Sequence, residues 1–211
     1  MCDSTKFWNR MASTYHKNPH LRDNAQRNLI EMSLPYLRKK DKILDFGCGT
    51  CWASIDISPE VSKVVALDTS RKMIEVGTKY AVSKSIGNIQ FINDSIHTDS
   101  LENGMFDVII TYDILHLISN TSKTIRRMHN LLKPGGIVIS TTPCVGERKV
   151  VYRLLKSLSK FGVTPDITEF SRHDLINQFK KLGFSIIKVE EGSKNIPEVF
   201  IVAKKSSWVV N

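Results

Sequence analysis

The amino-acid sequence predicts an α/β protein with a doubly wound, seven-stranded and mostly parallel sheet that ends in an antiparallel hairpin. Three observations lead to this fold class. Apolar runs of strand length alternate with segments of helical periodicity. The runs lack polar alternation, which favours parallel strands covered on both faces. The last two runs lie so close together in the chain that only an antiparallel turn can join them.

Five strands are expected ahead of the hairpin, and each is an apolar run bounded by polar residues or glycine. They are KILDF (42–46), KVVALD (63–68), IQFIN (89–93), FDVIITY (106–112) and GIVISTT (136–142). The hairpin is expected in GFSIIKVEEG (183–192) and EVFIVAKK (198–205).

Amphipathic segments fill the gaps between the strands. Their spacing predicts helices over roughly 51–58, 70–83, 121–132 and 171–184, with an extra N-terminal helix over 20–38. Thr69 or Ser70 is the expected cap of the helix over 70–83. Pro134, Gly135 and Gly136 stop the helix over 121–132 and turn the chain into the fifth strand.

Length and composition favour one domain over residues 1–211. The N-terminal MCDSTKFWNR has no signal-peptide core, and no apolar run is long enough to span a bilayer. We therefore expect a cytoplasmic protein. Four cysteines are too few for a disulfide scaffold, so they are expected to be thiols.

The chain is basic, with a net charge of +9 and a pI near 9.4. Its lysines and arginines are scattered, and no basic stripe is interleaved with aromatic residues as in single-strand binders. A solvated basic surface is therefore favoured over a nucleic-acid interface.

The stretch KILDFGCGTCWASIDIS (42–58) contains two overlapping patterns. Cys48 and Cys51 have the C-x-x-C spacing of a redox dithiol or half a zinc site, but no other cysteine or histidine has matching spacing. No metal is therefore expected. Gly47 and Gly49 follow a buried strand and precede a helix, where a backbone without side chains turns tightly and approaches a ligand.

The ligand predicted for this turn carries positive charge rather than phosphate. Trp52 occupies the third position of the dinucleotide pattern G-x-G-x-x-G, where an indole blocks pyrophosphate, and no P-loop string exists. Asp45 places a carboxylate beside the turn, which repels phosphate and attracts a cation. S-adenosylmethionine, with its sulfonium and ammonium groups, meets both conditions.

The string ILDFGCGT resembles motif I of the class I S-adenosylmethionine-dependent methyltransferases, and further segments over residues 40–205 are similar to that family. They are VVALDTS, FINDSIH, FDVIITYDILHLI and LLKPGGIVIST. The resemblance implies a Rossmann-like methyltransferase fold and S-adenosylmethionine as cofactor. It implies ribose contacts from Asp68 and adenine contacts from Asp94 and Ser95. The cofactor-binding candidates are Asp45, Gly47, Cys48, Gly49, Asp68, Thr69, Asp94, Ser95 and Tyr112. Cys51 departs from the family, which often has a third glycine there.

The resemblance also bears on the acceptor. The chain lacks the Pro-Pro tetrapeptide of adenine and glutamine N-methyltransferases, and its Leu115-His116 element resembles small-molecule methyltransferases of ubiquinone and menaquinone biosynthesis. His116 is the catalytic candidate, as a base or as a substrate contact, although a structural histidine is equally consistent. The acceptor-pocket candidates are Trp8, Tyr15, Asp113, His116 and Cys144.

Two variable segments are expected to border the acceptor. Residues 1–38 resemble the family's N-terminal cap, in which Trp8 and Tyr15 either cover the pocket or anchor the segment to the sheet. Residues 143–170 are expected to be a substrate-cap insertion. Within it, residues 147–162 alternate apolar and basic positions, which suits an apolar substrate, an anionic membrane surface or core packing.

Three functions remain open at this point. The leading one is methyl transfer from S-adenosylmethionine to a small-molecule acceptor by in-line displacement. The alternatives are an RNA or protein methyltransferase of the same fold, and a non-catalytic S-adenosylmethionine-binding protein. The partners expected are a small-molecule acceptor and a possible peripheral membrane contact through 147–162, without nucleic acid. The sequence indicates no oligomeric state.

Overall fold

The computed structural model describes residues 3–17, 24–191 and 197–206. The chain divides into two compact units, residues 1–98 and 99–211. The single-domain organisation and the limits of the two cap segments stay predictions. Gly192, the last residue of one expected hairpin strand, lies outside the described residues.

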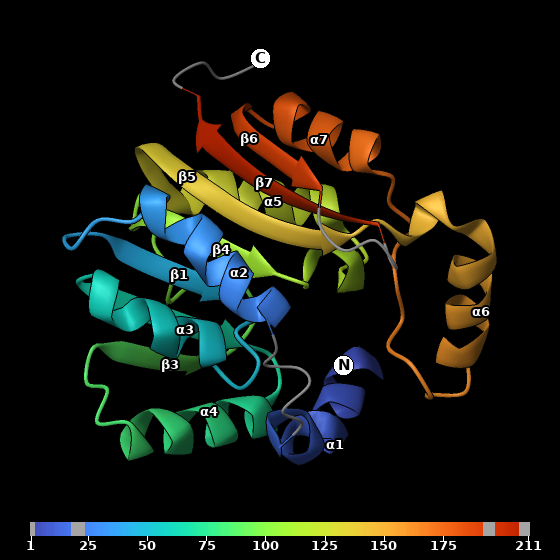
Figure 1. The fold of residues 1–211 in the computed structure, drawn as a ribbon, viewed down its shortest axis with the longest axis horizontal. Coiled ribbons are helices and arrows are strands. Elements are labelled where there is room, and N and C mark those ends of the chain that lie inside the picture. The colour runs from blue at the N-terminus through green and yellow to red at the C-terminus, as the bar shows by residue number, and fades with distance from the viewer. Residues whose placement is uncertain (1–2, 18–23, 192–196, 207–211) are drawn as a thin grey trace. The chain divides into compact units, whose positions relative to one another are not determined.

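The first unit is built around three parallel strands, β1 (Lys42–Phe46), β2 (Lys63–Asp68) and β3 (Ile89–Asn93). β2 lies between the other two strands, and its Val64, Val65, Ala66 and Leu67 have no exposed surface. The helices of this unit are α1 (Asp3–Lys17), α2 (Asn24–Ser33), α3 (Trp52–Ile57) and α4 (Arg71–Ser83), and its 3₁₀ turns are η2 (Leu34–Tyr36) and η3 (Ser58–Glu60). α1 packs beside α4 (Figure 1).

The second unit contains β4 (Phe106–Tyr112), β5 (Leu132–Pro143), β6 (Phe184–Glu191) and β7 (Glu198–Lys205). β4 and β5 are parallel, whereas β7 is antiparallel to both β5 and β6. Its helices are α5 (Thr121–Leu131), α6 (Lys149–Ser159) and α7 (Arg172–Lys181), with 3₁₀ turns η4 (Leu115–Leu117) and η5 (Val145–Glu147). α7 covers the hairpin strands, and α6 stands beyond the end of β5 (Figure 1).

The strand order β3-β2-β1-β4-β5-β7-β6 gives a mostly parallel sheet of seven strands with an antiparallel C-terminal hairpin. The predicted α/β fold class is therefore confirmed. β1 to β4 have the expected bounds. β1, β2 and β4 are apolar runs that the sheet largely buries, whereas β3, at the edge of the sheet, contains no fully buried residue.

Two elements differ from expectation. The helix expected over 20–38 is described as α2, which ends at Ser33 and is followed by the 3₁₀ turn η2 with Pro35 near its start. β5 begins at Leu132 rather than at Gly136, because Leu132 already pairs with Phe106 of β4. A register shift follows at Phe106/Val108, beside Gly135 with its φ of 73°.

Candidate functional site

The turn after β1 is a left-handed backbone segment fixed by β2. Gly47 has a φ of 76° and Gly49 a φ of 53°, values that suit glycine. The N–H groups of Gly47 and Cys48 donate to the carbonyl of Leu67 at 2.8 and 3.1 Å. A Cβ placed on Gly49 would meet no atom within 4 Å. The open space at Gly49 therefore lies where a ligand can approach the backbone.

The carboxylate of Asp68, at the end of β2, joins this turn to the start of α4. The N–H of Gly49 donates to Asp68 Oδ2 at 3.0 Å, and the N–H of Ser70 donates to Oδ1 at 2.7 Å. Burial raises the pKa of Asp68, and these two hydrogen bonds oppose that rise. A carboxylate oxygen can accept about two hydrogen bonds, and each oxygen of Asp68 accepts one from these N–H groups, so each retains a lone pair for a ligand hydroxyl.

Asp45 is the fourth residue of β1 and precedes the turn. It is 3% exposed, and its Oδ2 accepts a hydrogen bond from Ser54 Oγ at 2.5 Å. Burial raises the pKa of Asp45 to about 7, and the nearby charge of Asp68 adds to the rise. Near neutral pH this carboxyl is therefore only partly ionised, so its attraction for a cation depends on pH.

The two cysteines of the turn are buried thiols. Cys48 Sγ and Cys51 Sγ are 3.4 Å apart, and burial raises the pKa of Cys48 well above its ordinary value. Cys51 caps α3 with a φ of 62° and is fully buried. Within residues 3–17, 24–191 and 197–206, no group of three or more histidine, cysteine and acidic side chains is placed to hold a metal.

The residues that follow β3 form a tight polar turn. The N–H of Ser95 donates to Asp94 Oδ1 at 2.7 Å, and the N–H of His97 donates to Ser95 Oγ at 3.3 Å. Hydrogen bonds, first from Thr98, lower the pKa of the exposed Asp94. Asn93 Nδ2 donates to the carbonyl of Asp68 at 2.9 Å, which ties the ends of β2 and β3 together.

The aromatic candidates of the N-terminal segment lie on α1, which docks onto α4. Trp8 and Tyr15 are partly buried and pack edge to face, with ring centroids 6.0 Å apart. Asn9 Oδ1, on the same helix, accepts hydrogen bonds from Ser70 Oγ at 2.8 Å and from the N–H of Lys72 at 3.1 Å. Thr69 is exposed, and its Oγ1 accepts from Thr5 Oγ1 at 3.4 Å. The structure therefore holds α1 beside the end of β2 and the start of α4.

In the second unit, Asp113 follows the buried Tyr112 at the end of β4. Asp113 has a φ of 55°, a left-handed conformation that is uncommon outside glycine. Its Oδ1 accepts a hydrogen bond from Thr141 Oγ1 at 3.4 Å. The residue as a whole is exposed, yet surrounding protein desolvates its carboxyl and, with the charge of Glu198, raises the pKa to about 7.

His116 lies in the 3₁₀ turn η4 close behind Asp113 in sequence. Its Nδ1 is buried without a hydrogen-bond partner, and burial lowers the pKa of His116 to about 4. Its carbonyl accepts a hydrogen bond from the N–H of Thr168 at 2.7 Å. The imidazole is therefore neutral at physiological pH and is a weak base.

Cys144, the last acceptor-pocket candidate, is completely buried after β5. Its Sγ donates to the carbonyl of Thr142 at 3.5 Å, and its N–H donates to the carbonyl of Pro197 at 2.6 Å. Burial raises the pKa of this thiol to about 12, so it stays protonated.

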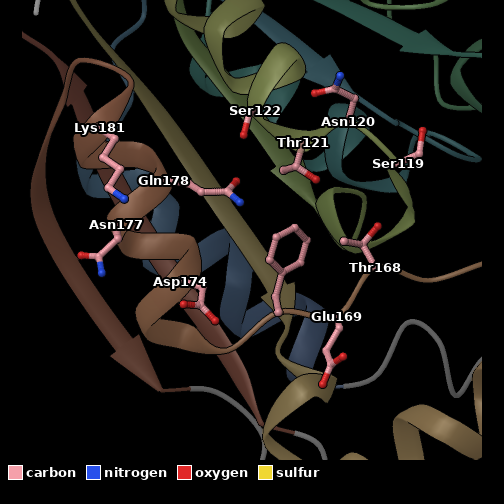
Figure 2. A pocket seen from close by; sticks show the side chains of 11 residues that line it. Ser119, Asn120, Thr121, Ser122, Thr168, Glu169, Asp174, Asn177, Gln178 and Lys181 are labelled. Atoms are coloured by element: carbon pink, nitrogen blue, oxygen red, sulfur yellow. The ribbon is translucent and has the colours of Figure 1, made fainter.

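A polar groove of about 490 Å³ lies within the second unit, between the start of α5, the segment 168–170 and α7 (Figure 2). Gln178 extends from α7 toward the start of α5, and its Oε1 is buried without a hydrogen-bond partner. The groove is lined by Ser119, Asn120, Thr121, Ser122, Thr168, Glu169, Phe170, Asp174, Asn177, Gln178 and Lys181. None of these residues was among the sequence candidates.

The structure thus brings Asp45, Gly47, Gly49 and Asp68 together at the ends of β1 and β2. Tyr112, Asp113 and His116 belong to the second unit, as does the buried Cys144. Asn9 and Asn93 were missed by sequence reasoning. Asn93 could have been found from the sequence, because it ends a predicted strand beside Asp94. No feature of the sequence pointed to Asn9, because its contacts are with residues far along the chain.

A family model described as a methyltransferase domain matches residues 37–193. Over 134 residues the chain is 23% identical to the uncharacterized methyltransferase YcgJ of Bacillus subtilis, which covers 64% of this chain and 53% of that protein. Over 129 residues it is 30% identical to the demethylmenaquinone methyltransferase of Staphylococcus epidermidis, which covers 58% of this chain and 53% of that protein. The chain spans about half the length of these curated relatives.

The fold is shared with solved structures as well. The crystal structure of YcgJ superposes with a TM-score of 0.74 at 15% identity, covering 86% of this chain and 100% of that one. At this level of identity the likeness concerns the fold alone.

Proposed function

This chain belongs to the class I S-adenosylmethionine-dependent methyltransferase family, and we propose that it transfers a methyl group from S-adenosylmethionine to a small-molecule acceptor. The sulfonium of the cofactor supplies an activated methyl group, which is lost to the acceptor by in-line displacement. The protein then has to bind the cofactor and the acceptor, to align them for the transfer and to exclude water.

The observation that carries the proposal is the carboxylate of Asp68, held by the N–H groups of Gly49 and Ser70 at 3.0 and 2.7 Å. These bonds fix the position of both oxygens and leave a lone pair on each, which suits a pair of ribose hydroxyls. The open space beside Gly49 gives the cofactor a route to the backbone of the turn. The residues present therefore fit the cofactor.

The small-molecule class of acceptor is supported by the relatives. One matching protein is named for demethylmenaquinone and another for ubiquinone and menaquinone biosynthesis. The absence from this sequence of the Pro-Pro element of base and glutamine N-methyltransferases points the same way. An RNA or protein acceptor finds no comparable support in the residues described.

Asp113 is better suited than His116 to accept a proton from the acceptor. A general base works best with a pKa near the working pH. The pKa of Asp113 is raised to about 7, whereas that of His116 is lowered to about 4. If Asp113 serves this role, activity rises with pH through 7 in the wild type, and Asp113→Asn loses that rise. A pH dependence that survives in Asp113→Asn would contradict it.

The first experiment is calorimetric titration of the full chain with S-adenosylmethionine and, separately, with NAD. We expect saturable binding of S-adenosylmethionine alone. Asp68→Ala removes the ribose acceptor and is expected to weaken binding at least about tenfold, since two charge-assisted hydrogen bonds are lost.

Gly49→Ala and Gly104→Ala form a matched pair for the turn. Both glycines have positive φ, 53° and 67°, and a Cβ at either position meets open space. Both variants therefore carry similar backbone strain, about 1–2 kcal/mol. Only Gly49→Ala is expected to weaken cofactor binding. Equal affinity of the two variants, or binding of NAD in place of S-adenosylmethionine, would overturn the cofactor assignment.

A further inference from the structure

α6 exposes an apolar surface that the described protein leaves uncovered. No residue of α6 is buried. Val150 is 80% exposed and Leu154 60%, and beyond the helix Phe161 is 79% and Val163 60% exposed. These four are half of the eight exposed large hydrophobic side chains among the described residues. Burial of such side chains is favourable, so a clustered set indicates a binding surface.

A basic flank accompanies this apolar surface. At 3.6 residues per turn, Val150 and Leu154 share one side of α6, and the adjacent side presents basic residues. The basic residues of the segment are Arg148, Lys149, Arg153, Lys156 and Lys160. No acidic residue occurs between 148 and 163, so every charged side chain of the segment itself is positive.

The turn after α6 is folded back against the helix. The N–H of Val163 donates to the carbonyl of Leu158 at 3.2 Å, and Thr164 Oγ1 donates to the carbonyl of Leu155 at 3.0 Å. Lys156 pairs with Asp166 at 2.5 Å. Phe161 and Val163 are therefore ordered beside the helix, which lowers the entropy lost when the surface binds.

We propose that residues 148–163, the helix α6 with its following turn, bind the surface of an anionic lipid bilayer. A bilayer interface offers both an apolar layer for Leu154 and Phe161 and negative headgroups for the basic flank. A second copy of the chain would bring two positive segments together, which is repulsive. A nucleic acid would match the charge but would leave the exposed aliphatic side chains in water.

The test is flotation of the full-length protein with vesicles of phosphatidylcholine alone and with vesicles that also contain phosphatidylglycerol. We expect binding only to the anionic vesicles, and we expect salt to weaken it. No cofactor or acceptor is present in this experiment. Its failure therefore leaves the methyl-transfer proposal untouched, and failure of S-adenosylmethionine binding leaves this one untouched.

Two pairs of double variants separate the apolar and basic contributions. The double variant Leu154→Ser with Phe161→Ser is expected to weaken vesicle binding at least about tenfold. Its control is Val82→Ser with Ile187→Ser, at exposed apolar positions elsewhere, which is expected to leave vesicle binding unchanged. The double variant Arg153→Gln with Lys160→Gln is expected to bind the anionic vesicles roughly fivefold more weakly for each charge removed. Its control, Lys63→Gln with Lys123→Gln, is expected to leave vesicle binding unchanged. All eight side chains are exposed, so the variants are expected to fold.

Three outcomes would overturn the proposal. The first is equal binding to both vesicle types or to neither. The second is equal loss in the α6 variants and their controls. The third is self-association of the wild type, abolished by Leu154→Ser with Phe161→Ser, in a protein that ignores vesicles. That result would assign the surface to a second copy of the chain.

Discussion

Cys51 and Gly77 form a complementary pair at the residue scale. Cys51 stands where the family often has glycine and keeps a left-handed φ of 62°. A Cβ on Gly77 of α4 would lie 2.6 Å from Cys51 Sγ and 3.1 Å from its Cβ. The thiol is therefore accommodated because the facing helix lacks a side chain at this position.

A double-mutant cycle tests this pairing. Gly77→Ala alone is expected to destabilise the chain by about 1–3 kcal/mol through overpacking. In a Cys51→Gly background the closest remaining contact is the Thr50 carbonyl carbon at 3.2 Å, so the same change is expected to cost less. Urea unfolding measures both effects, with Gly87→Ala as the control in open space. An equal cost in both backgrounds would show that the pair is not coupled.

Asp45 gives the protein a pH-dependent stability at the same scale. Its pKa is raised from 3.8 to about 7 in the folded state. Between these values the folded chain binds more protons than the unfolded chain, so this group loses stabilising effect as pH rises. Asp45→Asn keeps an acceptor for Ser54 and carries no charge. We expect it to match the wild type near pH 4 and to exceed it by about 1–3 kcal/mol at pH 8.

Thermal or urea unfolding across pH 4–8 measures the difference between Asp45→Asn and the wild type. The exposed Asp99→Asn is the control for removal of a carboxylate from the surface. A stability difference that does not change with pH would mean that Asp45 is ionised throughout this range.

At the scale of elements, α1 supplies part of the cap of α4. The N-terminal N–H groups of a helix lack partners within it. Ser70 Oγ accepts from the N–H of Met73 at 3.2 Å, while Asn9 Oδ1 accepts from the N–H of Lys72 and from Ser70 Oγ. The cap of α4 is therefore shared between its own sequence and a helix 61 residues away.

Asn9→Ala is expected to cost about 1–2 kcal/mol, because it removes one cap acceptor and leaves two donors unpaired. Faster proteolysis within α1 is expected to accompany the loss. Asn9→Asp keeps the oxygen and adds a negative charge at a helix N-terminus, so it is expected to be as stable as the wild type. Urea unfolding and limited proteolysis read out both variants, and equal losses would exclude the capping role.

For the whole molecule, the relevant quantity is the net charge of +9. Like charges repel in the compact state, and salt screens this repulsion with a Debye length of about 8 Å at physiological ionic strength. We expect added NaCl to stabilise the protein on the order of 1 kcal/mol, or roughly 2–4 °C in melting temperature. A melting temperature that falls with NaCl would show that attractive ion pairs outweigh the net repulsion.

The exposed ion pairs support this expectation. Lys39 with Glu60 and Lys72 with Glu75 lie on the surface at 3.1 and 2.8 Å, where solvent makes such pairs weak. Among the described residues the candidate cofactor turn contains no pair of this kind. The stability of the turn is therefore expected to respond little to salt.

The sequence by itself determined the bounds of β1 to β4 and the turn that follows β1. Buried parallel strands are continuous apolar runs, so their bounds are visible without any long-range information. Gly47 and Gly49 are also a local signal, since left-handed backbone is restricted to few residue types. Family membership follows from these local patterns taken together.

Only the tertiary structure decided which of the candidate residues contact one another and which are buried. It placed Asp68 against Gly49, Asn9 against the start of α4, and Cys144 in the interior. It also raised the pKa of Asp113 and lowered that of His116. The roles of these residues in binding and catalysis stay predictions.

The same division holds for surfaces. The amphipathic pattern of 147–162 was visible in the sequence and was compatible with three environments. The structure left Val150 and Leu154 exposed, and it formed the polar groove around Gln178 from two helices and the loop before α7. Periodicity gives the side of a helix on which a residue lies. Whether that side is covered depends on segments distant in sequence, and their packing is a property of the folded chain alone.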